Sequence, residues 1–244
     1  MIRFNFIYLI ILIALNAYSS CERGGVKVIR HGGIVTIMPS SHESIEEVTG
    51  YTNLLRSLSG LTPEIKRVLI PGCGAGDEIA HVLEVFKEVS KIVACDVDAR
   101  STEYVHNNYK EIKDRVSILT CDFSVDDPLD NEENFNLVIL RHPELGMTRE
   151  SHMIWRKIFT NSLNSLSEEG VLLMTTYVKH EVKTFRDLLP GGYRVLSFGR
   201  SPFFCSQEYI YKRGFTLGKD LFRMVIKKDL KYRRKKSFFH FFSS

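Results

Sequence analysis

The apolar residues of this chain form short runs of strand length, and between most of these runs the apolar positions recur with a helical period. Such an alternation of buried strands with amphipathic helices is typical of an α/β domain. The predicted strands are 67–70, 92–95, 115–121, 135–140, 171–177, 193–198 and 221–226, and the predicted helices are 77–86, 98–109, 149–166 and 179–189. The pattern therefore predicts a doubly wound α/β fold with helices on both faces of a mostly parallel sheet.

Two smaller features accompany this pattern. Residues 26–38 alternate around a pair of glycines, which predicts a short hairpin, and a serine-capped helix is expected to follow and to run to Leu58. A polar turn is expected at 168–170, directly before the strand at 171–177. At 244 residues, 44% of them apolar, the chain suits one α/β domain with a single core.

The strand at 67–70 breaks into a turn with glycines at alternate positions, Gly72, Gly74 and Gly76. Glycine lets the backbone turn sharply and approach a ligand closely, because no Cβ atom intervenes. Twenty residues after Gly76, Asp96 ends the next apolar run, where a carboxylate can accept hydrogen bonds from both hydroxyls of a ribose. This arrangement predicts a nucleotide-binding elbow.

The spacing of the elbow argues against a dinucleotide. The dinucleotide fingerprint is Gly-x-Gly-x-x-Gly, whereas this chain has Gly-x-Gly-x-Gly followed by Asp77. A carboxylate would repel a pyrophosphate but would tolerate a ligand with a cationic or zwitterionic part. A dehydrogenase is therefore disfavoured.

The elbow resembles the first motif of class I methyltransferases that use S-adenosylmethionine. Its wording, Pro-Gly-Cys-Gly-Ala-Gly-Asp at 71–77, is most similar to the thiopurine-methyltransferase-like branch. The resemblance covers roughly residues 63–228 and implies a Rossmann-like methyltransferase fold, with a seven-stranded sheet that 193–198 and 221–226 close as a C-terminal antiparallel hairpin. Many members carry an acid where this chain has Ile70, so the contact with the amino-acid end of the cofactor must come from elsewhere.

The resemblance also implies which residues bind S-adenosyl-L-methionine. Asp96 would hold the ribose, Asp122 would contact the adenine amino group, and Phe123 would pack on the adenine ring. A cap of the local turn is the structural alternative for Asp122. The full set of expected cofactor-binding residues is Gly72, Gly74, Gly76, Asp96, Val97, Asp122, Phe123 and Arg141.

A second turn, which begins at Arg141, follows the apolar run 135–140. Ligands in open α/β sheets lie beyond the carboxyl ends of the strands, so this turn should face the transferred methyl group. It lacks Asn-Pro-Pro-Tyr, the signature of methylation at nucleobase amino groups. His142 and Glu144 are the candidates for a general base or a substrate contact; the alternative is that they only shape the loop.

The predicted function is methyl transfer to an unidentified acceptor by in-line displacement, in which the enzyme mainly aligns the reactants and excludes water. Two alternatives stay open. One is a non-catalytic adenosyl-ligand-binding or scaffold protein with the same fold. The other is a spermidine-synthase-like aminopropyltransferase, which would require a Gly-Gly-Gly-Asp type of turn.

The five cysteines are odd in number, irregularly spaced and without a Cys-x-x-Cys pair. We expect them to be reduced and structural, which favours a reducing compartment, and we expect no metal site. The net charge of +4 comes from the end of the chain, because residues 227–244 hold seven Lys or Arg and one Asp. The remaining residues therefore carry 26 bases and 28 acids.

Both ends of the chain suggest membrane contact. Residues 1–21 contain an apolar block at 2–18 with the basic residue Arg3 near its start, which predicts a signal or membrane-anchor segment. An exported enzyme would lack its cytosolic cofactor, so three interpretations stay open. The segment is a cleaved export signal, an uncleaved anchor that keeps the domain cytoplasmic, or an over-extended start of the sequence with little functional meaning. The tail places bases beside phenylalanines, which suits an anionic membrane and, less so, single-stranded nucleic acid; a tail without a specific role is the third reading. The expected organisation is 1–21 signal or anchor, 22–62 a segment covering the site, 63–228 the methyltransferase domain and 229–244 the tail.

Overall fold

The computed structural model describes residues 27–31, 34–38, 45–62, 64–125, 134–143, 149–203 and 220–229. The predicted signal or anchor at 1–21, Glu144 and the tail beyond Asp229 lie outside these ranges. Within them, no helix combines the length and the apolar character that crossing a bilayer requires.

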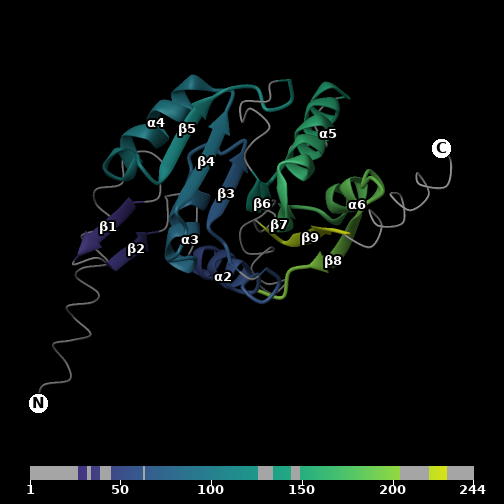
Figure 1. Ribbon diagram of the computed structural model, residues 1–244, viewed down its shortest axis with the longest axis horizontal. Helices are drawn as coiled ribbons and strands as arrows, with labels where there is room; N and C mark the ends of the chain where they lie inside the picture. The colour runs from purple at the N-terminus through teal and green to yellow at the C-terminus, as the bar shows by residue number, and fades with distance from the viewer. Residues whose placement is uncertain are drawn as a thin grey trace, which may run out of the picture.

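Seven strands form one sheet in the order β5-β4-β3-β6-β7-β9-β8 (Figure 1). Neighbouring strands are parallel from β5 to β7, and β9 is antiparallel to both β7 and β8. The prediction of a mostly parallel sheet with a C-terminal antiparallel hairpin is thereby confirmed. The strands are β3 (Arg67–Pro71), β4 (Lys91–Asp96), β5 (Val116–Thr120), β6 (Phe135–Arg141), β7 (Leu166–Thr176), β8 (Tyr193–Arg200) and β9 (Phe222–Lys228).

Helices cover both faces of the sheet because each central strand buries both of its faces. In β3, Val68 and Ile70 belong to one core cluster, whereas Leu69 belongs to the other. Apolar side chains of α2, α3 and α4 complete the first cluster, and those of α5 and α6 complete the second. The helices are α2 (Ile45–Arg56), α3 (Asp77–Val85), α4 (Ala99–Tyr109), α5 (Arg149–Asn164) and α6 (Lys179–Asp187), with a short 3-10 helix η1 (Lys110–Ile112) after α4.

The N-terminal hairpin forms a separate two-stranded antiparallel sheet of β1 (Lys27–His31) and β2 (Ile34–Met38). Both β2 and α2 contact α3, the helix that begins at the glycine elbow (Figure 1). The predicted hairpin and the following helix are confirmed as elements. Their predicted role in covering the site stays a prediction.

The predicted turn at 168–170 is wrong, because β7 already begins at Leu166. Phe135 pairs with Leu166 but Leu137 pairs with Val171, so the residues between bulge out of the β6–β7 ladder. A Cβ atom at Gly170 would clash with the carbonyl oxygen of Phe135. The polar residues there mark an irregularity inside the strand, since a bulge leaves residues unpaired and exposed.

Candidate functional site

The glycine elbow joins β3 to α3 with three left-handed residues, Gly72, Gly74 and Gly76, whose φ angles are 67°, 47° and 75°. The three glycines have different surroundings. A Cβ atom at Gly76 would lie 2.8 Å from a methyl group of Val105, whereas one at Gly74 would meet no atom within 4 Å. Gly76 therefore serves close packing of α4, and Gly74 leaves open space beside the turn.

Asp96, at the end of β4, holds the elbow in place. One carboxylate oxygen accepts a hydrogen bond from the backbone N–H of Gly74 at 2.9 Å, and the other accepts one from the backbone N–H of Asp98 at 2.9 Å. Each oxygen of a carboxylate has a second lone pair. The same side chain can thus fix the turn and accept two further hydrogen bonds, as a ribose would require.

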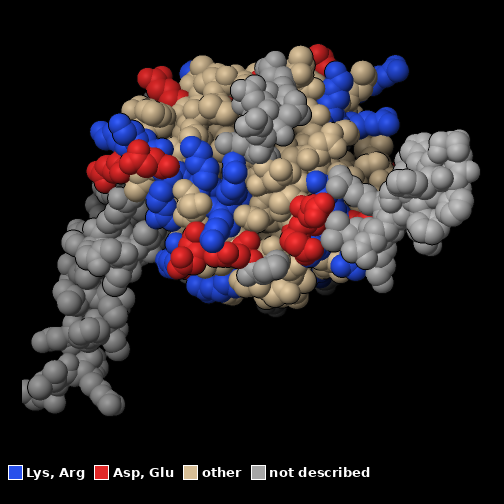
Figure 2. Space-filling view, viewed as in Figure 1, with Lys and Arg blue, Asp and Glu red and all other residues tan. Residues whose placement is uncertain are grey.

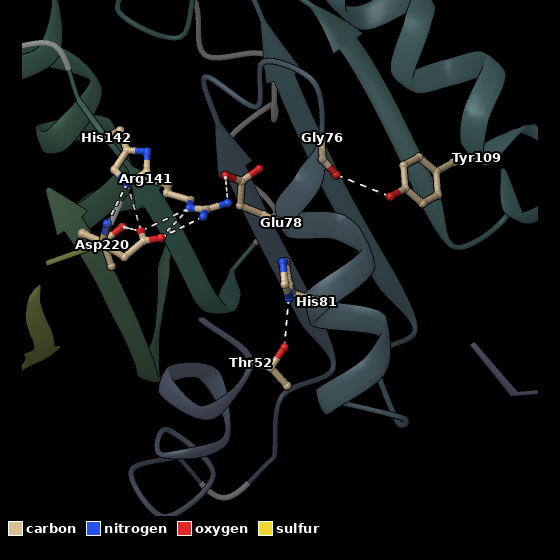
Figure 3. Close-up of polar contacts among 9 residues, drawn as sticks. Thr52, Gly76, Glu78, His81, Tyr109, Arg141, His142 and Asp220 are labelled. Carbon is tan, nitrogen blue, oxygen red and sulfur yellow. Dashed lines mark hydrogen bonds and ion pairs between the residues drawn. The ribbon is translucent and has the colours of Figure 1, made fainter. Parts of the chain in front are cut away.

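Tyr109 supports the elbow from α4. Its hydroxyl donates to the carbonyl oxygen of Gly76 at 3.4 Å (Figure 3). Burial, together with the charges of Asp77 and Glu78, raises the pKa of Tyr109 above its usual range. The phenol therefore keeps its proton and acts as a donor at neutral pH.

Three further residues expected to bind the cofactor follow β4 and β5, and two of them, Asp122 and Phe123, are expected to contact adenine. Val97 is 73% exposed and lies directly after Asp96. Asp122 accepts a hydrogen bond from the backbone N–H of Ser124 at 2.9 Å, so it caps the local turn. Phe123 is buried in the cluster beneath α5, where its carbonyl oxygen accepts a hydrogen bond from Asn161. The contact of Val97 with the cofactor and the contacts of Asp122 and Phe123 with adenine stay predictions.

Arg141, at the end of β6, is the centre of a buried ionic network (Figure 3). Its side chain is only 5% exposed, and it donates to the carboxylate of Asp220 from Nε at 3.0 Å and from Nη2 at 2.7 Å. Its Nη1 lies 3.4 Å from Glu78 of α3, and its guanidinium stacks over the ring of Tyr51 of α2 at 4.2 Å. Arg141 therefore joins the end of β6 to α2, to α3 and to Asp220, two residues before β9.

Asp220 is fully buried and adopts a left-handed conformation with φ of 59°. It also accepts a hydrogen bond from the hydroxyl of Thr175 in β7. Burial by itself would raise the pKa of Asp220, but the charge of Arg141 and the contact with His142 outweigh it and hold the pKa well below the usual range. The carboxylate is thus ionised at neutral pH.

His142 follows Arg141 and lies against the same carboxylate. Its backbone is left-handed, with φ of 55°, and its ring stacks on Tyr177 with centroids 4.1 Å apart. Nε2 lies 3.0 Å from the backbone nitrogen of Asp220 and 3.1 Å from carboxylate oxygen Oδ1 of the same residue. A neutral Nε2 can accept the N–H, and a protonated Nε2 can donate to the carboxylate.

The sequence reasoning missed three members of this network that lie far from the predicted turn, namely Glu78, Thr175 and Asp220. Asp220 stands 79 residues after Arg141, and no local pattern connects the two. A buried pair also joins α2 to α3, where Nδ1 of His81 lies 3.0 Å from the hydroxyl of Thr52 (Figure 3). The ring of Tyr51 meets the ring of His81 edge to face at 4.9 Å.

The cysteines nearest the elbow, Cys73, Cys95 and Cys121, are not joined in disulfides. Burial raises the pKa of Cys73, and a hydrogen bond with Cys121 together with burial raises that of Cys95. These two thiols stay protonated, as expected for structural cysteines. In the part of the chain that the structure describes, no group of three or more His, Cys, Asp or Glu side chains is arranged to bind a metal.

Comparison with known proteins places this geometry in context. Residues 41–192 match the family model described as "Methyltransferase small domain". No curated protein matches the chain.

Three solved structures illustrate the similarity of fold. N-methyltransferase NodS from Bradyrhizobium japonicum is 16% identical over 74% of this chain and 93% of its own, with a TM-score of 0.51. An S-adenosylmethionine-dependent methyltransferase from Clostridium acetobutylicum is 10% identical over 76% of this chain and 93% of its own, with a TM-score of 0.56. The plantazolicin methyltransferase BpumL, solved with SAH, is 10% identical over 75% of this chain and 84% of its own, with a TM-score of 0.51.

Proposed function

The chain belongs to the methyltransferase small domain family and catalyses S-adenosylmethionine-dependent methyl transfer, and we propose that it binds this cofactor across the glycine elbow and Asp96. The observation that carries the proposal is the combination of an Asp96 carboxylate that fixes the backbone of Gly74 with open space next to Gly74. A small ligand can approach the backbone there, and Asp96 can accept the hydroxyl hydrogens of a ribose. These features fit an adenosyl group.

We further propose that Gly72, Gly76 and Val97 line the adenosyl group and that Asp122 and Phe123 contact the adenine. S-adenosylmethionine supplies an electrophilic methyl group on a sulfonium when it is bound. The protein's own contribution is to align an acceptor atom with that methyl group and to exclude water, which accounts for much of the rate gain in such reactions. For Arg141 we propose a supporting role, because its guanidinium is committed to Asp220 and Glu78; its predicted direct contact with the cofactor stays a prediction.

His142 is our proposed base where the acceptor atom must lose a proton. The backbone N–H of Asp220 points at Nε2, so this role requires the imidazole to give up that hydrogen bond and take the tautomer with its proton on Nε2. Nε2 then donates to the Asp220 carboxylate and Nδ1 is the basic nitrogen. A carboxylate behind a histidine orients the ring and stabilises the protonated form. Glu144, which lies outside the described residues, stays the proposed substrate contact.

Three finer assignments also remain proposals. The similarity to the thiopurine-methyltransferase-like branch rests on the wording of residues 71–77. The signal or anchor at 1–21 rests on its apolar block, and membrane contact of the tail rests on its bases and phenylalanines. Cell fractionation with protease protection tests the anchor: a domain that is protected only inside spheroplasts excludes export.

Calorimetry of the full chain with S-adenosylmethionine, S-adenosylhomocysteine and NAD tests the cofactor site. We expect both adenosyl ligands to bind and NAD not to bind. Asp98→Asn is the matched control for a substitution of Asp96 and should bind the adenosyl ligands normally. Asp98 lies two residues from Asp96 but points to Arg100, and Asn is an equally good helix cap. Binding of NAD alone, or of neither adenosyl ligand to a folded sample, would refute the proposal.

A further inference from the structure

The N-terminal half of α5 projects beyond the edge of the sheet that carries the proposed site. The helix runs antiparallel to the strands, because its end at Ser165 accepts a hydrogen bond from Phe135 at the start of β6, whereas Trp155 lies over Gly72 just past the end of β3. Its buried residues, Ile158, Phe159, Ser162 and Leu163, all lie in its second half. Arg149 lies six residues before Trp155, which corresponds to about 9 Å of helix beyond the elbow.

The projecting turns expose apolar side chains. Met153 is 57% exposed and Ile154 is 38% exposed. The solvent-facing side of a surface helix normally carries polar or charged residues, so these two apolar side chains depart from that pattern. Among the described residues, six large apolar side chains are exposed, and five of them lie at this edge of the sheet: Val97, Val125, Met153, Ile154 and Phe203. The exposed apolar surface is therefore concentrated at the carboxyl edge.

Basic side chains surround the two apolar residues of α5. Arg149, Arg156 and Lys157 are exposed on the same helix, against the single acid Glu150, and Figure 2 shows blue side chains gathered over this helix at upper right. Arg149, Met153 and Lys157 follow one another at intervals of four residues, so they form one stripe along the helix. Met153 and Ile154 line a shallow hollow there together with Arg149, Glu150 and Lys157.

We propose that the projecting half of α5 docks on the surface of an anionic phospholipid bilayer. Apolar side chains flanked by Lys and Arg are the pattern of interfacial membrane helices, in which the apolar residues enter the headgroup region and the bases pair with anionic lipids. An RNA backbone would be attracted by the same bases but gains nothing from an exposed Met and Ile. The chain also carries an apolar block at 2–18 and a basic tail, and either would hold α5 near a membrane at high effective concentration.

Docking in this way would turn the carboxyl edge of the sheet toward the lipid. If the methyl-transfer site is where we propose it, this orientation places that site at the bilayer surface. The methyl acceptor is then a membrane-borne or amphiphilic molecule, an inference that rests on the proposed function. Docking itself depends on α5 alone and does not require the cofactor site to be assigned correctly.

The full chain contains one tryptophan, Trp155 on α5, which makes the test specific. Fluorescence of the full chain is measured with vesicles of phosphatidylcholine, and with vesicles in which one third of the lipid is phosphatidylglycerol, each with and without a doxyl-labelled lipid that quenches tryptophan. We expect several-fold stronger quenching in the anionic vesicles. Because the apolar block and the tail contain no tryptophan, their insertion gives no quenching of its own, and strong quenching requires Trp155 itself to lie at the bilayer.

Met153→Gln with Ile154→Gln should abolish the quenching, and Arg149→Gln with Lys157→Gln should remove the preference for anionic vesicles. Tyr104→Gln on α4, another exposed apolar residue, is the matched control and should behave as the natural chain. If the chain sediments with the vesicles but Trp155 is not quenched, the proposal is overturned. It is also overturned if an RNA oligonucleotide changes the fluorescence of Trp155 as strongly as the anionic vesicles do. Cofactor binding of the same variants should be unchanged, so a failure of the cofactor site is distinguished from a failure of docking.

Discussion

The guanidinium of Arg141 lies 2.7 Å from the carboxylate of Asp220, and the two residues are 79 positions apart in the sequence. The pair connects the end of β6 to the start of β9 across β7, the strand between them in the sheet. Both side chains are nearly or completely buried. Removing one partner of a buried ion pair leaves the other charge uncompensated, which costs far more than the intact pair contributes.

Asp220→Asn should therefore lower the free energy of unfolding at pH 7 by about 3 to 5 kcal/mol. Because the folded-state pKa of Asp220 lies below its value in the unfolded chain, this contribution is complete above the unfolded pKa of about 4 and is lost as the pH falls further. Urea unfolding of both proteins from pH 3 to pH 8 measures the difference, which should be constant above about pH 5 and shrink below about pH 4.

Glu64→Gln is the control for that measurement. Glu64 pairs with Lys66 at 3.0 Å, the two side chains are 52% and 54% exposed, and exposed pairs contribute about 0 to 1 kcal/mol. An Asp220→Asn variant as stable as this control would mean that the Arg141 pair does not organise the end of the sheet.

Asp96→Ala should weaken S-adenosylmethionine binding by about 1 to 3 kcal/mol, the range for lost hydrogen bonds to a charged group. The same change frees the backbone N–H of Gly74, so a small loss of stability should accompany the loss of affinity. Calorimetry and urea unfolding on the same samples separate the two effects. Unchanged affinity would show that Asp96 only supports the turn.

The glycines of the elbow should respond differently to alanine. Gly76→Ala places a methyl group against Val105 in a left-handed conformation and should destabilise the fold by about 1 to 3 kcal/mol. Gly74→Ala meets only open space, so the backbone strain of about 1 kcal/mol is its main cost to stability, while its methyl group should obstruct the cofactor.

Gly60→Ala completes this series as a control, because its Cβ atom would contact nothing within 4 Å and its φ angle lies outside the left-handed region. Its stability and cofactor affinity should match those of the natural chain. If Gly74→Ala binds the cofactor normally, the open space beside Gly74 is not the ligand site.

Thr52→Val should destabilise the contact between α2 and α3 by about 1 to 3 kcal/mol, because it removes the hydroxyl beside the fully buried ring of His81. Thr184→Val, on the exposed side of α6, is the matched control and should change the free energy of unfolding by less than about 0.5 kcal/mol. Equal effects of the two changes would rule out a structural role for the Thr52–His81 pair.

Local pattern was sufficient for most of the fold. The strand at 135–140 and the elbow at Gly72 to Gly76 are both signalled by neighbours within a few residues, and a parallel sheet brings the carboxyl ends of its strands to one edge. The position of Asp96 beside the elbow could be predicted for the same reason. The continuation of β7 through Glu168 and Glu169 could not, because polar residues precede a strand and occupy a bulge equally well.

The sequence by itself determined the order of the elements, the α/β class and the residues that follow the carboxyl ends of the strands, because hydrophobic period and glycine spacing are local properties of the chain. Only the tertiary structure decided that Arg141 and His142 face Asp220, that Asp96 also binds the backbone of Gly74, and that half of α5 stands clear of the core with Met153 exposed. The physical reason is that a charge pair or an exposed face depends on which distant segments pack together. That choice is made by the burial of the whole core and is not encoded at either residue alone.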